Sequence, residues 1–208
     1  MLSFIRTLVF PHEFTAFVTN YAARTKGVEL SLETLNTGLV RGFFNSKEEL
    51  IGGYVIRSGQ NLRAFSFLSK EQRANIALRD FECCEIACMW NHKEKLSPFD
   101  TAKLYFHSHW DAALLGKRYV VAGTIVPQVR RRIQKTLVKQ LWSGTVQTSR
   151  GAPPIPYWIQ FNRSFLVLPY FLFQVFPETA IEIRRFLSKP KQPQAQLTSK
   201  NSQNSGSI

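Results

Sequence analysis

Apolar side chains recur at the spacing of an amphipathic helix in two segments of the chain. The first segment opens at Pro11 and stops before Gly27, and its apolar positions are Phe14, Phe17, Val18 and Tyr21. The second opens at Pro127 and runs to about Lys139, with Val129, Ile133 and Leu137 facing inward. Proline suits the first turn of a helix and glycine its end, so this punctuation supports the helical periodicity.

The best-marked helix is predicted after Ser97. Ser97 can cap it, Pro98 suits its first turn, Asp100 stands three residues after the cap, and Gly116 closes it. We expect its buried side to be the apolar one, formed by Phe99, Ala102, Phe106, Trp110 and Ala113.

Apolar runs typical of strands alternate with these helices. Leu39 to Phe44 and Leu50 to Arg57 are joined by the polar segment NSKEE, which predicts an antiparallel hairpin. Ser69 and Gln72 have the spacing of a capping box and predict a short helix, after which Cys83 to Trp90 is predicted as a strand. Three later runs are also predicted as strands: Tyr119 to Val126, Gln140 to Gln147 and Tyr157 to Leu168.

The most apolar stretch of the chain runs from Ser164 to Phe176. It is shorter than the roughly 20 residues that a membrane-spanning helix needs, and Pro169 interrupts it. We therefore expect a core strand there rather than a membrane span, while docking on a membrane surface stays open.

The order of elements predicts the fold class. Strands followed by helices favour an α/β (α+β) fold, with a mixed, mostly antiparallel sheet flanked by helices. No repeat or linker interrupts residues 1–188, which we expect to form a single domain. Residues 189–208 are rich in Gln, Ser, Asn, Pro and Lys and are predicted to be a disordered polar tail.

Composition narrows the class of protein. The 208 residues are 44% hydrophobic and carry a formal net charge of +13, so the chain can bury a core and is not a disordered basic tail. Cys83, Cys84 and Cys88 crowd into one segment, unlike the even, spaced cysteines of a secreted disulfide scaffold. The first residues lack the pattern of a cleavable signal peptide. We therefore expect a reducing, cytoplasmic setting.

The element order, the hairpin GFFNSKEELIGGYVIRSG and the strand CCEIACMW leading into a capped helix resemble the GNAT superfamily of N-acyltransferases. The resemblance covers about residues 36–165 and is nearest to the divergent branch with acyl-homoserine-lactone synthases and peptide fatty-acyl transferases. Cys88 stands where those synthases carry arginine, and NHKEKLSP (91–98) replaces the glycine-containing phosphate loop of the family. The resemblance implies that a medium or long acyl group passes from acyl-CoA or acyl carrier protein to an amine, without a tightly bound cofactor.

The resemblance also places the carbonyl group of the donor beside the strand from Cys83 to Trp90. Donor contacts are then expected from this strand and the loop after it: Ala87, Met89, Trp90, Asn91, Lys93, Lys95 and Ser97. The two lysines and the helix N-terminus near Ser97 carry positive charge that attracts phosphate. Because the glycine loop is missing, acyl-CoA and acyl carrier protein remain equal candidates for the donor.

Glu85 is the leading candidate for the base that takes a proton from the amine. On a regularly alternating strand it shares a face with Ala87 and Met89. Small and apolar neighbours raise the pKa of a carboxyl group, which suits proton uptake near neutral pH. The alternative is a structural role, either in an ion pair with an arginine or as a solvated residue at a strand edge.

The helix after Ser97 offers three further catalytic candidates. His107 has Asp111 one turn later, a spacing that can orient an imidazole. His109 lies nearer the apolar stripe, which favours a packed and hydrogen-bonded core residue. Tyr105 is a weaker candidate for a general acid.

Cys84, Cys88 and His92 are potential metal ligands, but their spacing of four residues suits a helix, whereas this segment is predicted as a strand. The chain has no further cysteine to supply a second ligand pair, so we predict no metal site. A cysteine that forms a thioester is the other alternative, although buried strand cysteines are usually inert.

The stretch from Ala112 to Pro177 contains no Asp or Glu. It holds many basic residues: Lys117, Arg118, Arg130, Arg131, Arg132, Lys135, Lys139, Arg150 and Arg163. A field of one sign attracts acidic partners, namely an acidic acyl carrier protein, an acidic peptide segment or anionic lipid. We expect such a partner to contact Arg130, Arg131, Arg132 and Lys135. No motif that reads nucleic-acid bases is present, so no specific nucleic-acid partner is expected.

The resemblance, together with these observations, implies an N-acyltransferase that acts on an amine of a small molecule or of a peptide side chain. The alternative is a non-catalytic basic module that kept a GNAT-like scaffold and docks on anionic lipid or nucleic acid. The missing glycine loop favours this alternative.

Overall fold

A single sheet runs through the molecule and carries the chain's strands. The computed structural model describes residues 3–25, 30–147 and 153–188. Within them the sheet has seven strands: β1 (Phe4–Thr7), β2 (Gly38–Phe44), β3 (Leu50–Ser58), β4 (Cys83–Asn91), β5 (Tyr119–Thr124), β6 (Lys139–Val146) and β7 (Ile155–Arg163). Their order is β1-β2-β3-β4-β5-β7-β6, and only β4 and β5 are parallel neighbours. A parallel pair needs a crossover, and a long helix supplies it.

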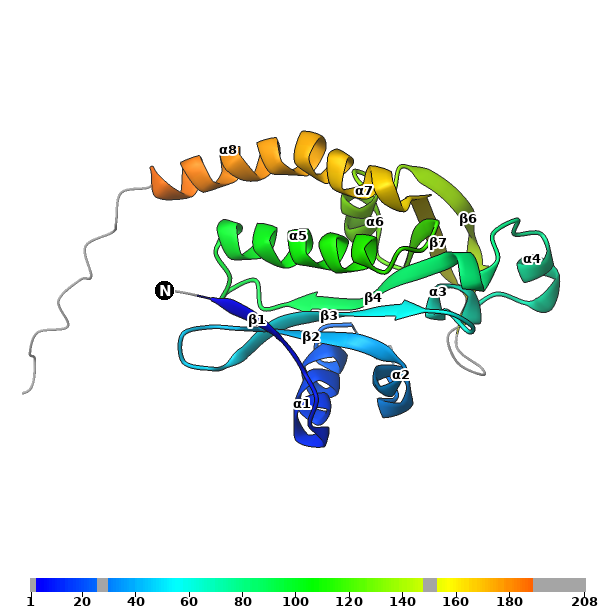
Figure 1. Ribbon diagram of the computed structural model, residues 1–208, viewed down its shortest axis with the longest axis horizontal. Helices are drawn as coiled ribbons and strands as arrows, with labels where there is room; N and C mark the ends of the chain where they lie inside the picture. Colours follow the sequence, from blue (N-terminus) through cyan, green and yellow to red (C-terminus); the bar gives the residue numbers. More distant parts are fainter. Residues whose placement is uncertain (1–2, 26–29, 148–152, 189–208) are drawn as a thin grey trace, which may run out of the picture.

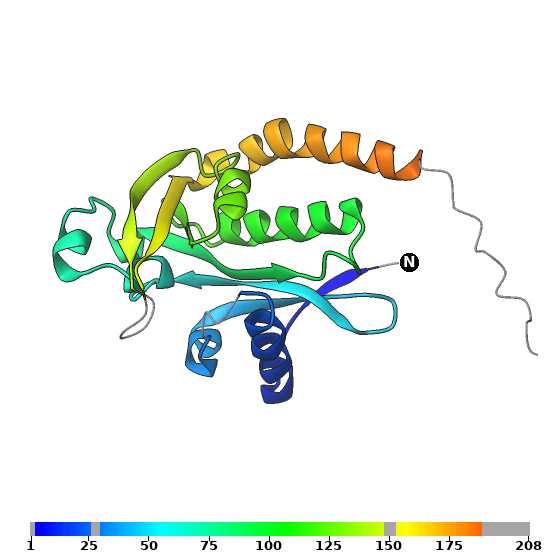
Figure 2. The same ribbon diagram turned by 180° about the vertical axis from the view of Figure 1, so that it is seen from behind.

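Helices lie on both faces of the sheet (Figure 1). One face carries α1 (Pro11–Ala22) and α2 (Leu32–Asn36), and the other carries α5 (Pro98–Leu114) and α6 (Pro127–Ile133). The connection from β3 to β4 contains α3 (Arg63–Ser66), α4 (Lys70–Ala74) and a 3-10 turn (Asp80–Glu82). After β7, the chain forms α7 (Ser164–Tyr170), a π-helical turn (Phe171–Val175) and α8 (Phe176–Leu187), which run along the outer side of α5 (Figure 2).

The fold class predicted from the sequence is confirmed. The hairpin is present as β2 and β3, and the strand from Cys83 is present as β4. The helices predicted after Ser69 and Ser97 both start there, because each serine side chain accepts a hydrogen bond from the backbone N–H three residues later. The helix from Pro127 is shorter than predicted and ends at Ile133, since β6 already begins at Lys139. The predicted tail, residues 189–208, lies outside the described residues.

The predicted strand through Ser164 to Phe176 is wrong, because this segment is helical. β7 ends at Arg163, and Val167 and Phe171 of the following helical segment are buried. An apolar run without a clear period fits a strand and a buried helix equally well, so the sequence pattern did not decide between them. No helix in the described part of the chain is both long and apolar enough to cross a membrane.

The buried side of α5 also differs from the prediction. The residues buried there are Leu104, Ser108, His109, Asp111 and Ala112, whereas Phe99 and Trp110 are exposed. Polar groups can face the sheet because partners on other elements satisfy them. The predicted apolar stripe instead turns partly toward the C-terminal helices, where the ring of Phe106 lies 5.7 Å from that of Phe171.

Asp111 connects α5 to three strands through hydrogen bonds. Its carboxylate accepts from Arg41 Nε on β2 at 2.8 Å and from the Tyr54 hydroxyl on β3 at 2.8 Å. Arg41 also donates to the hydroxyl of Thr7 on β1 at 2.6 Å. The Asp111 hydrogen bond raises the pKa of Arg41, and burial raises the pKa of Tyr54, so both groups keep their protons.

The Asp111→Ala substitution should lower the free energy of unfolding by about 3 kcal/mol, because it leaves Arg41 and Tyr54 without their buried partner. The milder Tyr54→Phe substitution removes only one hydroxyl and should cost about 1 kcal/mol. Urea unfolding followed by circular dichroism measures both changes. Equal and negligible effects of the two variants would show that this group does not stabilise the fold.

Candidate active site

The pairing between β4 and β5 stops near the start of β4. The strands are in register at Cys83↔Tyr119, Cys84↔Val120 and Glu85↔Val121, and at no later position. β4 still continues to Asn91, and β5 continues to Thr124. The strand edges beyond Glu85 and Val121 are therefore not paired with each other, although β4 and β5 are neighbours in the middle of the sheet.

A β-bulge interrupts β4 just beyond this point. Gly53 of β3 lies opposite Trp90 and Val55 lies opposite Ala87, so two residues of β4 face one residue of β3. The bulged residue Cys88 has a φ of 51°, in the left-handed region that non-glycine residues rarely adopt. A bulge bends and twists its strand, and here it accompanies the parting of β4 from β5.

The bulge also corrects the predicted faces of β4. Ala87 packs with the buried side chains under α1, while Met89 packs with those under α5. The prediction that Met89 shares a face with Glu85 and Ala87 is therefore wrong. It assumed strict alternation, and the extra residue of the bulge resets that alternation.

Glu85 lies at the last position where β4 and β5 are paired. Its side chain is 2% exposed, and its two carboxylate oxygens accept hydrogen bonds from the backbone N–H groups of Arg63 and Ala64, at 2.7 and 2.8 Å. These N–H groups belong to the first turn of α3, where no earlier carbonyl satisfies them. Glu85 therefore positions α3 against the sheet.

Burial raises the pKa of Glu85 to about 7, although the Arg57 charge and the two backbone hydrogen bonds oppose this rise. The environment predicted from the sequence is thus present, and the carboxyl group changes its charge near neutral pH. The structural alternative is present as well, because the same carboxylate holds α3.

Glu85 is surrounded by residues that no sequence pattern predicted. Arg57 lies opposite Glu85 in the register of β3 and β4. Tyr21 from α1 and Tyr157 from β7 lie within electrostatic range of Glu85, and burial raises the pKa of both phenols. Tyr157 donates a hydrogen bond to the carbonyl of Ala64 at 3.0 Å, so it holds α3 together with Glu85. No spacing in the sequence connects these residues, because only the packing of α1 and α3 on the sheet brings them together.

His109 is a packed core residue, which is the structural alternative considered for it. Its Nδ1 contacts the carbonyl of Tyr105 at 2.7 Å, and its Nε2 contacts the hydroxyl of Thr136 at 2.8 Å. A carbonyl only accepts, so Nδ1 carries the proton and Nε2 accepts from Thr136. Burial lowers the pKa of His109 to about 4, which keeps the ring neutral.

The pairing expected between His107 and Asp111 is not what the structure shows. Asp111 is bound by Arg41 and Tyr54 instead, and it acts on His107 only as a nearby charge. His107 is half-buried, and burial lowers its pKa. His107, His109 and Tyr105 belong to α5, on the face of the sheet opposite α3 and Glu85. The structure does not bring them together with Glu85.

In the loop from β4 to α5, the helix N-terminus that was expected to bind phosphate is already hydrogen-bonded within the chain. Ser97 is engaged as the cap of α5, and the Asp100 carboxylate accepts hydrogen bonds from the Ser97 backbone N–H and hydroxyl. Ser3 also donates to Asp100. This carboxylate takes the place beside the helix N-terminus that a phosphate favours.

The remaining predicted donor residues have varied surroundings. Lys95 forms an exposed ion pair with Glu49 at 3.2 Å, and Lys93 is exposed in the loop. Asn91 ends β4 opposite Gly52. Trp90 is buried under α1, where its ring meets Phe17 edge-on at 5.7 Å and its indole Nε1 has no hydrogen-bond partner.

Of the four basic residues predicted to contact an acidic partner, two are engaged within the chain and two are exposed. Arg130 donates to Gln140 and lies over the ring of Trp158 at 4.9 Å, and Lys135 forms an ion pair with Glu178 of α8. Arg131 and Arg132 remain exposed on α6. Fewer positive charges are therefore available to an acidic partner than the sequence suggests.

The cysteines lie in buried positions of β4. Burial raises the pKa of Cys83 to about 11 and that of Cys84 and Cys88 to about 12, so all three remain thiols at neutral pH. Among the described residues, no three His, Cys, Asp or Glu side chains lie close enough to hold a metal ion.

No protein-family model matches the sequence, and no curated protein matches it. Several solved structures match the fold. FeeM, an N-acyl amino acid synthase from uncultured soil microbes, is 19% identical with a TM-score of 0.60, over 83% of this chain and 94% of FeeM. A GNAT superfamily phosphinothricin acetyltransferase from Sinorhizobium meliloti, in complex with AcCoA, is 11% identical with a TM-score of 0.54, over 78% and 89% of the chains. TofI, in a ternary complex with an inhibitor and MTA, is 10% identical with a TM-score of 0.51, over 82% and 96%.

The raised pKa of Glu85 makes stability depend on pH in a defined direction. The folded state holds this proton up to about pH 7, whereas the unfolded chain releases it near pH 4.5. The unfolded state therefore binds fewer protons in this window, and stability falls as the pH rises through it. The shift corresponds to on the order of 3 kcal/mol.

Urea unfolding of the wild type and Glu85→Gln between pH 4.5 and pH 8.5, about one and a half units above the pKa, tests this contribution. The stability of the wild type relative to the variant should decrease up to about pH 7 and then level off. A difference between the two proteins that stays constant across this range would contradict the buried carboxyl group.

Proposed function

We propose that this protein, which has the fold of the GNAT acyltransferases, transfers an acyl group from a thioester to an amine, with Glu85 as the base. The single observation that carries the proposal is the position of Glu85 at the point where β4 and β5 stop pairing. There a buried carboxylate and two unpaired strand edges meet. The similarity of the fold to FeeM and to the acetyltransferase with AcCoA supports this class of reaction.

The unpaired edge of β4 suits the arm of an acyl thioester carrier. Residues of β4 beyond Glu85 have no partner on β5, so their backbone groups on that side are not used in a ladder. A pantetheine arm contains two amide groups, and an extended chain with amides can bind a free strand edge as an added strand. The thioester at the end of such an arm would lie beside the bulge, next to Glu85.

Glu85 would then move one proton. The amine nitrogen attacks the carbonyl carbon of the thioester, the new C–N bond forms and the C–S bond breaks. The proton lost by the nitrogen passes to the carboxylate, directly or through one water, and the departing thiolate takes a proton from solvent. A pKa of about 7 suits this step, because the group is partly ionised at neutral pH and still accepts a proton.

The acceptor we infer is a small amine that also carries a carboxylate, such as an amino acid. Arg57 lies opposite Glu85 in the register, so a guanidinium and the base are side by side on one face of the sheet. A guanidinium binds a carboxylate in a fork geometry, which would hold the amine toward Glu85. The name of FeeM, an N-acyl amino acid synthase, agrees with this class of acceptor.

The acyl group we infer is medium or long. Met89 and Ala122 lie on the α5 side of the two parted strands, among the apolar side chains beneath α5. An acyl chain that entered there would contact apolar groups, and the flexible methionine can adapt to it. Three buried free thiols agree with a reducing, cytoplasmic setting for the reaction.

Glu85→Gln should reduce kcat by about 10²–10⁴-fold, since it removes the proton acceptor. Wild-type kcat/KM should rise with pH through about 7, the pKa of Glu85, and the variant should lose this limb. The assay supplies a panel of acyl-CoA and acyl carrier protein thioesters with the standard amino acids. Free thiol and the masses of the N-acyl products are the readouts.

The matched control for this test is Glu71→Gln, at an exposed carboxylate on α4, which should keep wild-type rates. If the wild-type protein turned over no thioester in the panel, the proposed acyltransferase activity would be refuted and the alternative, a non-catalytic basic binding module, would remain. In that case Glu85→Gln would keep the biological activity, and charge reversal at Arg131 and Arg132 would abolish it.

The choice between acyl-CoA and acyl carrier protein can be made with two further variants. Lys93→Gln/Lys95→Gln should raise KM for acyl-CoA several-fold if these lysines meet its phosphates, and leave KM for the carrier protein nearly unchanged. Arg131→Gln/Arg132→Gln should do the reverse, because a carrier protein presents an acidic surface. If neither pair changes either KM, these basic residues do not contact the donor.

A further inference from the structure

The C-terminal helices expose a row of large apolar side chains. The residues concerned are all at least half exposed: Phe165 (67%), Leu172 (50%), Phe173 (80%), Phe176 (56%) and Ile181 (53%). They belong to α7, the π-helical turn and α8, which form the outer layer over α5 (Figure 1). Soluble surfaces rarely carry so many large apolar groups together, and such a patch usually marks an interaction site.

These side chains are not part of the core. Val167 and Phe171 of the same segment are 0% and 1% exposed, and they fix its inner side against α5. The five exposed residues are therefore not packed against α5, and they form the exposed, outer side of the segment. Within the described residues no element covers them.

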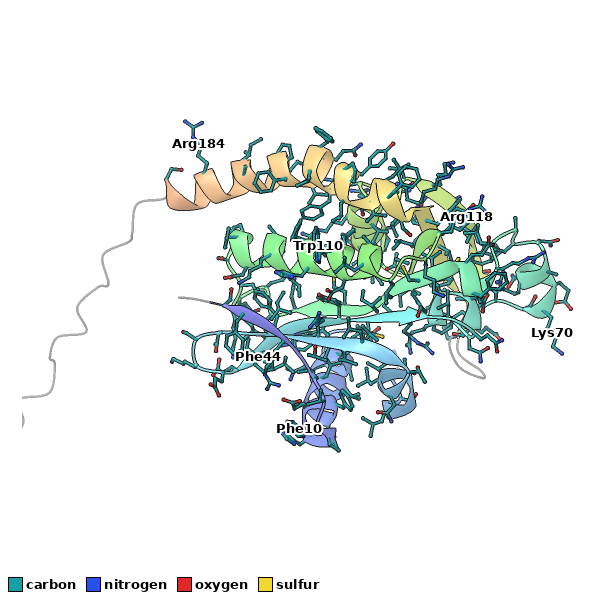
Figure 3. All side chains as sticks on the ribbon, viewed as in Figure 1. Phe10, Phe44, Lys70, Trp110, Arg118 and Arg184 are labelled. Carbon is teal, nitrogen blue, oxygen red and sulfur yellow. The ribbon has the colours of Figure 1, made fainter. Side chains whose placement is uncertain are left out.

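Basic residues stand beside the start of the row. A cavity of about 410 Å³ at the end of α5 is lined by Lys117, Arg118 and Arg163 together with Phe165 and Leu168. Arg118 makes an exposed ion pair with Glu82 at 3.3 Å, and Lys117 donates to the carbonyl of Phe81. Exposed contacts of this kind are weak, so both cations can bind an anionic group instead. At the other end of the row, Arg184 of α8 points away from the molecule (Figure 3).

We propose that the outer side of α7 and α8 docks on an anionic lipid bilayer, with the phenylalanines inserted among the acyl chains and Lys117, Arg118 and Arg163 at the headgroups. Protruding aromatic side chains next to cations match the interface of a bilayer, where an apolar layer lies beneath anionic groups. This arrangement is independent of Glu85 and of any activity.

The charge of the chain argues for this occupant over a second copy of the protein. Each copy carries a net charge of +13, and the stretch from Ala112 to Pro177 has no acidic residue. Glu178, the acidic residue beside Phe176, is paired with Lys135. Two such faces therefore repel each other. A folded protein partner would need a groove for the row, whereas a bilayer accepts separately protruding side chains.

Sedimentation of the full chain with vesicles tests the proposal. We expect it to bind vesicles of phosphatidylcholine with phosphatidylglycerol at physiological salt, and to bind pure phosphatidylcholine much more weakly. Phe173→Ser should weaken binding about tenfold by removing one inserted ring. Lys117→Gln/Arg163→Gln should weaken binding to the anionic vesicles about tenfold or more and change binding to neutral vesicles little.

Phe10→Ser is the matched control. Phe10 is 54% exposed and lies on the opposite side of the molecule, beside α1 (Figure 3), so its loss should leave vesicle binding unchanged. Equal effects of Phe10→Ser and Phe173→Ser, absence of binding, or equal binding to both kinds of vesicle would overturn the proposal. So would a dimer in sedimentation velocity that Phe173→Ser dissociates, or binding of an acidic carrier protein on this face in place of vesicles.

Discussion

The structure depends on one constraint in its sheet, namely that β4 pairs with β3 from Cys84 to Asn91, with one bulge, but with β5 over three residues only. β4 must therefore stay hydrogen-bonded to β3 while it separates from β5. The bulge at Cys88 allows both, because an extra residue keeps the pairing with β3 while it changes the direction of the strand. The position of the candidate active site follows from the place where the pairing with β5 ends.

Glu85 combines two duties at that place. As a carboxylate it satisfies two N–H groups of α3, and this role alone explains why a charged residue is tolerated in a buried strand. Its burial also brings its pKa to about 7, where a base is useful. A group that holds a neighbouring helix is rigidly placed, and rigid placement is what a proton transfer in a closed site requires. The structural role and the proposed catalytic role therefore support each other.

The two sides of α5 have different partners, because one side faces the sheet and the other faces the C-terminal helices. Its sheet-facing side accepts Asp111 and Ser108 because Arg41 and Tyr54 complete the hydrogen bonds of Asp111, and Ser108 donates to the carbonyl of Tyr105. Phe106 of α5 is thereby left to pack against Phe171 of the C-terminal helices. Those helices then carry a second apolar side that nothing in the described chain covers.

The sequence by itself determined the elements whose signals are local: the capped helices after Ser69 and Ser97, the β2–β3 hairpin and the strand with Glu85. Capping and periodicity act within a few residues, so they can be recognised without knowing which distant segments pack against the element. The bulge at Cys88, the end of the β4–β5 pairing and the cluster of Arg57, Tyr21 and Tyr157 around Glu85 were decided only by the tertiary structure. The same holds for the helical form of Ser164 to Phe176. Each of these features depends on which distant segment supplies a hydrogen bond or an apolar contact, and no residue spacing along the chain encodes that choice.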